Sequence, residues 1–179
     1  LVFCVADDPG MHSSQNEQDS RHYAKASKIV MLEPSDSEEC KEFTKQAFTL
    51  SEKFDTPCFL RLSTRVSHSQ SLVEISEREI CPLKPYEKNI GKYVMMPGNA
   101  IRRHVVVEDR ILALTALSEE CGFNKTEDNK SEIGVITSGI SYMYAKEALG
   151  DSVNYLKLGM VYPLPEKLIL DFAKKCKEN

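Results

Sequence analysis

Apolar and polar positions alternate along the first 75 residues in a rhythm that predicts strands and helices in turn. Three short apolar runs have the length and composition of buried strands, at residues 2–6, 29–32 and 58–62. The segments between them predict a short helix over residues 19–27 and a long helix that begins near Ser35. This strand–helix–strand order is typical of a parallel sheet.

The long helix carries the clearest pattern in the chain. Its apolar residues recur at helical spacing and form one face: Cys40, Phe43, Ala47, Leu50 and Phe54. Ser35, followed by Glu38 three residues later, predicts a capping box in which each side chain accepts a hydrogen bond from a free backbone N–H. Residues 55–57, Asp-Thr-Pro, predict the end of this helix.

The pattern degrades after the third strand, where apolar runs are short, charges are mixed and prolines recur. Structureless stretches of this length are uncommon inside one compact domain. We therefore predict a crossover linker over residues 76–104, with short antiparallel strands near residues 90–96. This linker would separate a first unit, residues 1–75, from a second unit, residues 105–179.

In the second unit, helical spacing from Glu108 onward predicts a helix that ends at Gly122, a residue suited to the position after a helix. The remaining pattern predicts strands at 133–137 and 155–158 and helices at 141–149 and 166–177. We therefore predict an α/β fold made of two parallel-sheet units.

Composition narrows the class of protein. The formal net charge of −4 argues against a nucleic-acid partner, and no apolar run approaches the roughly 20 residues that span a membrane. The six cysteines are scattered without a closely spaced pair, which argues against a metal or iron–sulfur site in this chain and suits the cytoplasm. Because Leu1 is not a methionine and lies in a predicted strand, we expect an internal segment of a longer protein.

The first strand runs into a dense polar segment over residues 7–21. In open α/β sheets, ligands bind outside the carboxyl ends of the strands, so this segment is a candidate site, although a solvated surface loop has the same composition. Parallel strands share a carboxyl edge, and the segment over residues 65–68, with Arg65 and His68, should therefore emerge beside this loop.

His12 is the candidate catalytic residue, because an imidazole donates to a developing oxyanion or accepts a proton near neutral pH. The alternative is a histidine that binds only the loop backbone. The neighbouring polar side chains would orient a substrate carboxylate or ketone, or else form turns and caps: Ser13, Ser14, Gln15, Asn16 and Gln18.

Other charged and small residues allow two interpretations. Arg21 suits a substrate carboxylate, but a salt bridge to Asp7, Asp8 or Asp19 is the stronger alternative. A catalytic pair of Asp7 and Asp8 is disfavoured, because adjacent residues of a strand point to opposite sides. The turn over residues 138–141 could hold an anion at a helix start or simply pack tightly.

Three segments resemble one enzyme family. Residues 7–21 (Asp-Asp-Pro-Gly-Met-His-Ser-Ser-Gln-Asn-Glu-Gln-Asp-Ser-Arg), residues 31–36 (Met-Leu-Glu-Pro-Ser-Asp) and residues 60–69 (Leu-Arg-Leu-Ser-Thr-Arg-Val-Ser-His-Ser) are similar to segments of the thiamine-diphosphate-dependent 2-oxoacid:ferredoxin oxidoreductases, above all the alpha subunits of the indolepyruvate type. A weaker similarity continues through residues 134–141 and 158–165.

The resemblance implies a fold and an activity. Residues 1–75 would form the later part of a pyrimidine-binding domain, and residues 105–179 part of a domain like the transketolase C-terminal domain. The site roles implied are catalysis by His12, substrate binding by Ser13, Ser14, Gln15 and Arg21, and cofactor binding by Asn16 and Gln18.

The resemblance also implies cofactors and partners. The parent enzyme would use thiamine diphosphate with magnesium and 4Fe-4S clusters, whose metal and cluster ligands lie outside this chain. It would convert an aryl 2-oxoacid and coenzyme A to an acyl-CoA, pass electrons to ferredoxin, and assemble with a second (beta) subunit and with itself. A branched-chain or simple 2-oxoacid, or a catalytically silent scaffold, is the alternative.

Overall fold

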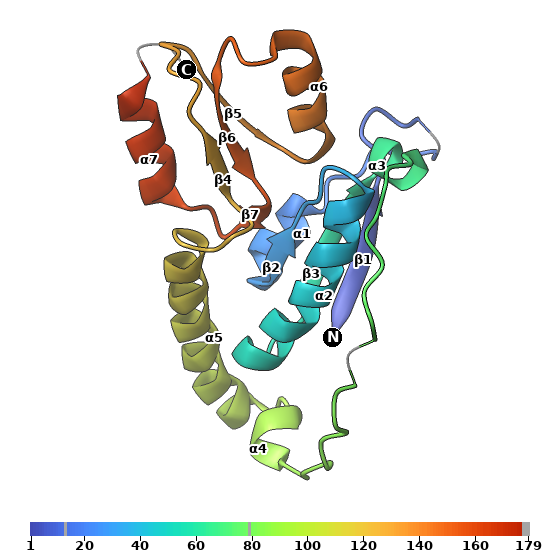
Figure 1. Ribbon diagram of the computed structural model, residues 1–179. Helices are drawn as coiled ribbons and strands as arrows, with labels where there is room; N and C mark the ends of the chain where they lie inside the picture. Colours follow the sequence, from blue (N-terminus) through green and yellow to red (C-terminus); the bar gives the residue numbers. More distant parts are fainter. Residues whose placement is uncertain (13, 79, 177–179) are drawn as a thin grey trace.

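The computed structural model describes residues 1–12, 14–78 and 80–176 and has an α/β fold (Figure 1). The elements of the first part, in chain order, are β1 (Val2–Asp7), α1 (Arg21–Ser27), β2 (Val30–Leu32), α2 (Ser37–Phe54), β3 (Cys58–Ser63) and α3 (Thr64–His68). The later elements are α4 (Ile90–Tyr93), α5 (Pro97–Ser118), β4 (Lys125–Glu127), β5 (Gly134–Ser138), α6 (Gly139–Leu149), β6 (Asn154–Leu158), β7 (Met160–Tyr162) and α7 (Glu166–Lys175).

The strands form two mixed sheets, so the prediction of parallel sheets is correct only in part. In the first sheet, ordered β1-β3-β2-β7, the first three strands are parallel and β7 runs antiparallel to β2. In the second, ordered β4-β6-β5, β5 and β6 are parallel and β4 is antiparallel. The apolar pattern did not predict β4, because the sequence of this strand, Lys-Thr-Glu, is polar. It did not predict β7, because this strand has only three residues and precedes a proline, as a loop would.

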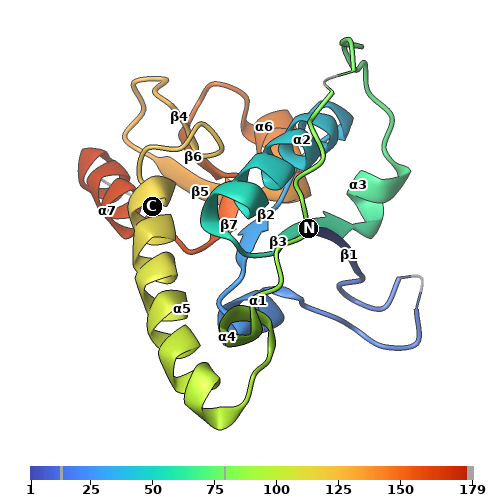
Figure 2. The same cartoon turned by 90° about the horizontal axis from the view of Figure 1, so that it is seen from below.

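Helices cover both faces of each sheet. Figure 2 shows α2 on one face of the first sheet and α1 on the other, while Figure 1 shows α6 and α7 on opposite sides of the second sheet. Because β7 follows β6 after Gly159 alone, the chain passes directly from the second sheet into the first. The two predicted units therefore share a sheet, and the boundaries at residues 75 and 105 stay a prediction.

The main core lies between α2 and the first sheet, and distant parts of the chain complete it. The predicted apolar face of α2 supplies Phe43, Ala47 and Leu50. Leu114 of α5 and Met160 of β7 are fully buried in the same cluster. Burial of such side chains contributes roughly 1.5–3 kcal/mol each, so residues of the predicted second unit help to stabilise the first.

The N-terminal cap of α2 lies one residue later than predicted. Asp36, not Ser35, is the capping residue, and its carboxylate accepts a hydrogen bond from the backbone N–H of Glu39 at 2.8 Å. The Glu39 carboxylate in turn accepts from the backbone N–H of Ser35 at 3.0 Å. The sequence Ser-Asp-Ser-Glu-Glu allows both registers, and burial of Glu39 selects this one.

The strands predicted near residues 90–96 are wrong, because residues 90–93 are helical and residues 94–96 belong to no helix or strand. Residues 90–93 form α4, and α5 begins at Pro97, where the missing proline N–H costs nothing. The predicted helix from Glu108 thus starts about three turns earlier, and it ends at Ser118 rather than at Gly122. By contrast, α6 ends at Gly150 as predicted, where a positive φ of 54° favours glycine.

A buried ion pair joins α2 to the second sheet. Lys157 of β6, which is 5% exposed, donates from Nζ to Glu39 Oε1 at 2.6 Å and to Ser35 Oγ at 2.7 Å. Burial opposes the charged form of Glu39, but the hydrogen bond and charge of Lys157 outweigh it and hold the Glu39 pKa below its ordinary value.

Gly159, between β6 and β7, marks the closest approach of the backbone to the core. A Cβ at this position would lie 2.4 Å from the carbonyl oxygen of Phe123 and 2.8 Å from Cζ of Phe43. Its carbonyl accepts from the backbone N–H of Glu33 at 2.8 Å, at the end of β2. No side chain fits here without a shift of the Phe123 backbone or of the Phe43 ring.

We predict that Gly159→Ala lowers the free energy of unfolding by about 1–3 kcal/mol, because the methyl group overpacks this contact. Gly98→Ala is the control, since it lies in the first turn of α5 with nothing within 4 Å of its Cβ. Urea denaturation of both variants measures the difference. Equal tolerance of the two substitutions would refute the packing argument.

We also predict that Glu39 stabilises the fold above pH 4.5, its ordinary pKa. Because its folded pKa is lower, this stabilisation is lost as the pH falls below 4.5 through the folded pKa. At pH 7, Glu39→Gln should cost about 3–5 kcal/mol, since it leaves Lys157 buried and unpaired. Urea titrations at several pH values should show the gap to wild type shrinking on the acid side.

Glu42→Gln is the matched control, because its carboxylate pairs with Lys41 on the exposed side of the same helix. Surface pairs of this kind contribute at most about 1 kcal/mol. A gap between wild type and Glu39→Gln that stayed constant between pH 3 and pH 7 would contradict the assigned ion pair.

Candidate active-site loop

The polar segment after β1 folds around the carboxylate of Asp8. Asp8 Oδ1 accepts a hydrogen bond from the backbone N–H of His12 at 3.1 Å, and Oδ2 accepts from the N–H and hydroxyl of Ser14 at 2.7 and 2.8 Å. Because Asp8 is only 7% exposed, these bonds replace water that the carboxylate loses on folding. Asp8 therefore shapes the loop from its base.

The same carboxylate ties the loop to α3. Thr64, the first residue of α3, donates from Oγ1 to Asp8 Oδ1 at 2.9 Å. Since β1 and β3 are parallel neighbours, the loop and α3 leave the sheet at the same carboxyl edge. The prediction that residues 65–68 emerge beside the loop is confirmed. Arg65 and His68 themselves are exposed on α3.

Two successive residues turn the chain at the loop tip. Gly10 has φ 74° and Met11 has φ 57°, and the N–H of Met11 donates to the carbonyl of Asp8 at 3.2 Å. A Cβ on Gly10 would lie 3.7 Å from Nε2 of His12, so the imidazole lies beside this glycine. The turn thus places the His12 ring at the tip, where the side chain is exposed.

The other predicted loop residues divide into exposed and engaged side chains. Gln15 and Asn16 are exposed, and the Ser14 hydroxyl also donates to the backbone carbonyl of Asn16 at 2.7 Å. Ser13 lies outside the described residues. The loop therefore presents His12, Gln15 and Asn16 to the solvent, while Ser14 contributes to its internal structure.

Gln18, predicted to bind a cofactor, contacts the base of the loop. Its Nε2 donates to the Ser20 hydroxyl at 3.0 Å and to Asp7 Oδ1 at 3.4 Å. Asp7 Oδ2 accepts from the backbone N–H of Ser20 at 2.8 Å, and Oδ1 accepts from its hydroxyl at 2.5 Å. These bonds join the residue before the loop to the residue after it.

Arg21 forms the ion pair that the sequence offered as an alternative to substrate binding. Its Nε and Nη2 donate to the two carboxylate oxygens of Asp19, each at 2.8 Å. The hydrogen bond from Arg21 lowers the pKa of Asp19 to about 2, although burial opposes this. The guanidinium remains exposed and keeps further N–H groups beyond those that Asp19 accepts.

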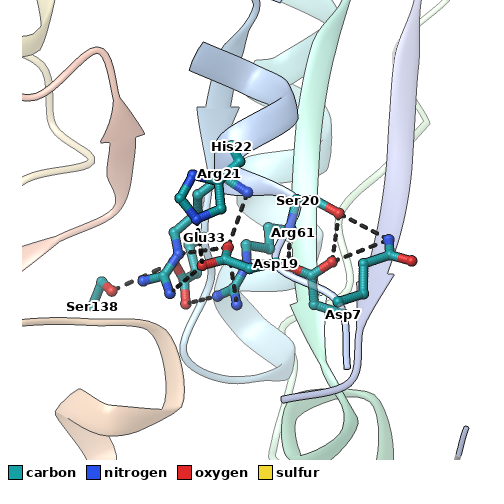
Figure 3. Close-up of polar contacts among 9 residues, drawn as sticks. Asp7, Asp19, Ser20, Arg21, His22, Glu33, Arg61 and Ser138 are labelled. Atoms are coloured by element: carbon teal, nitrogen blue, oxygen red, sulfur yellow. Dashed lines mark hydrogen bonds and ion pairs between the residues drawn. The ribbon is translucent and has the colours of Figure 1, made fainter. Parts of the chain in front are cut away.

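Arg61 of β3 lies beneath the loop and is only 5% exposed (Figure 3). Its Nε donates to Asp7 Oδ2 at 2.5 Å, and its Nη1 donates to Glu33 Oε1 at 2.6 Å. Nη2 lies 4.0 Å from Asp19 Oδ1. Asp7 and Asp8 thus bind different partners, as expected of adjacent residues at the end of a strand.

Glu33 connects this cluster to the second sheet. It follows β2, and its Oε2 accepts a hydrogen bond from the Ser138 hydroxyl at 3.4 Å. A Cβ on Gly139, which has φ 50°, would lie 2.5 Å from Glu33 Oε1. The helix start at 138–141, suggested as an anion site, thus faces a carboxylate of the chain itself. Burial raises the pKa of Glu33, although Arg61 and Arg21 oppose the shift.

Arg61 is not among the residues that the sequence predicts for the site, whereas Arg65 is. A charged residue inside the apolar run Cys-Phe-Leu-Arg-Leu was the available signal. Buried arginines are rare unless they are paired, so this position predicts acidic partners nearby. Asp7 and Glu33 follow neighbouring strands and were the matching signal.

Cofactor chemistry can be tested against the donors of this site. Among residues 1–12, 14–78 and 80–176, no group of three or more histidine, cysteine or acidic side chains is arranged to hold a metal ion. The carboxylates of Asp7 and Glu33 already bind Arg61. The donors described here therefore do not fit magnesium or an iron–sulfur cluster.

Within the same residues, no helix is both long and apolar enough to cross a membrane.

Comparison with curated proteins finds indolepyruvate oxidoreductase subunits named IorA. The IorA of Methanothermobacter marburgensis is 42% identical over 178 residues, covering 96% of this chain and 29% of the relative. Those of Archaeoglobus fulgidus and Thermococcus kodakarensis are 38% and 41% identical, covering 99% and 96% of this chain and 29% and 28% of the relatives. The chain thus spans less than a third of the length of these relatives. No family model matches the sequence.

A solved structure shares the fold. It is a 2-oxoglutarate:ferredoxin oxidoreductase from Magnetococcus marinus with 2-oxoglutarate, coenzyme A and succinyl-CoA bound. The TM-score is 0.58 at 14% identity, over 97% of this chain and 40% of the other. At this identity the likeness concerns the fold alone. Together with about 40% identity to the subunits above, it leads to one conclusion: the chain is homologous to a segment of IorA and represents part of the 2-oxoacid:ferredoxin oxidoreductase fold.

Proposed function

We propose that the chain is part of a thiamine-diphosphate-dependent oxidoreductase that oxidatively decarboxylates an aryl 2-oxoacid, such as indolepyruvate, and transfers its acyl group to coenzyme A, releasing carbon dioxide. Electrons released in the reaction would pass through 4Fe-4S clusters to ferredoxin. The names of the homologous subunits support the substrate class. Because the chain covers under a third of those subunits, the activity belongs to the whole enzyme.

One observation carries this proposal. The loop after β1 is fixed at the carboxyl edge of a parallel strand pair by a buried carboxylate, and it presents an imidazole and amide side chains to the solvent. Rigid scaffolds with polar loops at this edge are a common location for substrate sites.

The roles of the loop residues follow from their chemistry. His12 would donate to the oxygen that gains negative charge, or hold a proton at Nε2. Ser13, Ser14 and Gln15 would orient the substrate by neutral hydrogen bonds, and the Ser14 hydroxyl would have to release Asp8 and Asn16 to donate one. Asn16 and Gln18 would face the cofactor, Gln18 through its amide oxygen, since its Nε2 donates to Asp7 and Ser20.

Arg21 would bind the substrate carboxylate with the N–H groups that Asp19 leaves available. Asp19 accepts from Nε and Nη2, so the guanidinium keeps N–H groups that Asp19 does not accept. Asp19 also fixes the plane of the guanidinium, which reduces the side-chain entropy lost when a carboxylate binds.

Thiamine diphosphate, when bound by the whole enzyme, would supply the nucleophile and the electron sink of the reaction. Its magnesium ion and the 4Fe-4S clusters would be bound by residues outside this chain. The chain's own contribution would be to position the substrate and to donate hydrogen bonds to it. A second (beta) subunit, ferredoxin and self-association are the partners proposed, and the cytoplasm is the proposed location.

Two alternatives are distinguished by one assay. The reconstituted enzyme is supplied with thiamine diphosphate, magnesium, coenzyme A and a viologen dye, and it is offered aryl, branched-chain and simple 2-oxoacids in parallel. Dye reduction fastest with aryl acids supports the proposal, and preference for another class would assign that class instead. Absence of turnover with every acid would leave a silent scaffold.

For His12→Ala in the whole enzyme, we predict a loss of turnover much greater than the loss of cofactor affinity. Removal of one preorganised donor from such a site typically costs about 3 kcal/mol, or ~100-fold in rate. Loss of a structural hydrogen bond would instead cost about 1 kcal/mol of stability. Steady-state kinetics at varied thiamine diphosphate concentrations measures turnover and cofactor affinity, and a thermal melt measures stability.

His104→Ala is the control, because His104 is exposed on α5 and pairs with Glu108 there. This variant should retain near-normal turnover. If His12→Ala retained it as well and melted at a lower temperature, His12 would have only the structural role.

A further inference from the structure

The proposed function uses residues of the loop but leaves the buried Arg61 without a role. Its guanidinium is near the carboxylates of Asp7, Glu33 and Asp19, at 2.5, 2.6 and 4.0 Å. Burial of a charge in this way costs several kcal/mol unless the geometry compensates for it. An apolar residue would suit a strand that serves packing alone, so the arginine requires an explanation.

The first contact of Arg61 closes the loop. Asp7 precedes the loop and Ser20 follows it, and the two hydrogen bonds between them hold both ends together. Nε of Arg61 binds the same carboxylate oxygen of Asp7 that accepts the Ser20 N–H. Arg61 therefore fixes the base on which the loop of residues 8–19 is built (Figure 3).

The second contact orients that base relative to the second sheet. Nη1 of Arg61 binds Glu33, and Glu33 contacts Ser138 and Gly139 at the start of α6. The planar guanidinium thus sets the distance between the closed base of the loop and the start of α6. A lysine has one nitrogen on a flexible stem and cannot hold both carboxylates in a fixed geometry.

We propose that Arg61 is a positioning residue: it sets the conformation of the substrate loop by bridging Asp7, at the base of the loop, to Glu33, which follows β2 and contacts the start of α6. This inference rests on the proposed function of the loop. Arg61 itself touches neither substrate nor cofactor. The loop groups, His12 above all, would lose their alignment without it.

The chain offers a matched control for this role. Lys157 is equally buried, at 5% exposure, and its ion pair with Glu39 also joins the first part of the chain to the second sheet. However, its described contacts lie at the start of α2 and at the Tyr142 ring of α6, whose centroid is 4.5 Å from Nζ, rather than at the base of the loop. Lys157→Gln therefore perturbs a similar interaction without disturbing Asp7.

The test compares Arg61→Lys with Lys157→Gln in the full-length subunit within its assembled enzyme. The first readout is hydrogen–deuterium exchange of the amides of residues 8–20 without substrate. We expect exchange at least about tenfold faster in Arg61→Lys and unchanged exchange there in Lys157→Gln. Unchanged exchange in both variants would overturn the proposal.

The second readout separates kcat from KM. Misplacement of reacting groups by a remote substitution typically costs roughly tenfold to a hundredfold in rate. We therefore expect a loss of this size in kcat for Arg61→Lys, and a kcat within about twofold of wild type for Lys157→Gln. If both variants lost kcat equally, in proportion to the fall in their melting temperatures, Arg61 would have only a structural role.

Gly139→Ala provides a second variant in case Arg61→Lys does not fold. Its methyl group would lie 2.5 Å from Glu33 Oε1 and displace the carboxylate that Arg61 holds. Faster exchange over residues 8–20 is again expected, and wild-type exchange would contradict the bridge. If the wild-type enzyme converts no 2-oxoacid, the proposed function fails, whereas the exchange measurement still decides whether Arg61 positions the loop.

Discussion

The guanidinium of Arg61 is the constraint on which the candidate site depends. It is buried beneath the carboxyl edge of the first sheet and satisfies two buried carboxylates, one from each neighbouring strand. Without Asp7 and Glu33 the charge could not be buried, and without Arg61 the two carboxylates would be unpaired. The loop that carries His12 begins directly after one of these partners, so its position follows from this arrangement.

The two halves of the chain are connected by polar contacts as well as by packing. Glu33 meets the start of α6, and Glu39 meets Lys157 of β6. Between these contacts β7 pairs with β2, and Gly159 permits the close backbone approach. Buried ion pairs are demanding in geometry, so they fix how the second sheet is oriented against the first. Of these contacts, the one through Glu33 holds the start of α6 and the base of the substrate loop in one frame.

Elements with strong apolar periodicity were predictable from the sequence, and elements set by tertiary contacts were not. The strands before the polar loop and the apolar face of α2 appear where the pattern indicated. The strand β4 is polar and exists because it pairs with β6. The start of α2 is fixed by burial of Glu39, which local propensity does not report. Residues 90–96 read as strand because their apolar residues cluster, whereas they are helical or exposed.

The candidate site was predictable in location but not in structure. Composition indicated the loop, and parallel topology placed it beside α3. The pairing of Arg21 with Asp19 appeared among the alternatives. By contrast, the contacts of Arg61 with Asp7 and Glu33 and of Asp8 with Thr64 join residues 54, 28 and 56 positions apart. Such contacts leave only an indirect trace in the sequence, namely a charged residue within an apolar strand.

The most direct test of the central claim is an experimental structure of the whole enzyme with an unreacted aryl 2-oxoacid bound. The account predicts the acid at the carboxyl edge of the first sheet, within hydrogen-bond distance of His12 or Arg21, with Arg61 still bridging Asp7 and Glu33. An acid bound away from residues 8–21, or a loop held in place without Arg61, would contradict it.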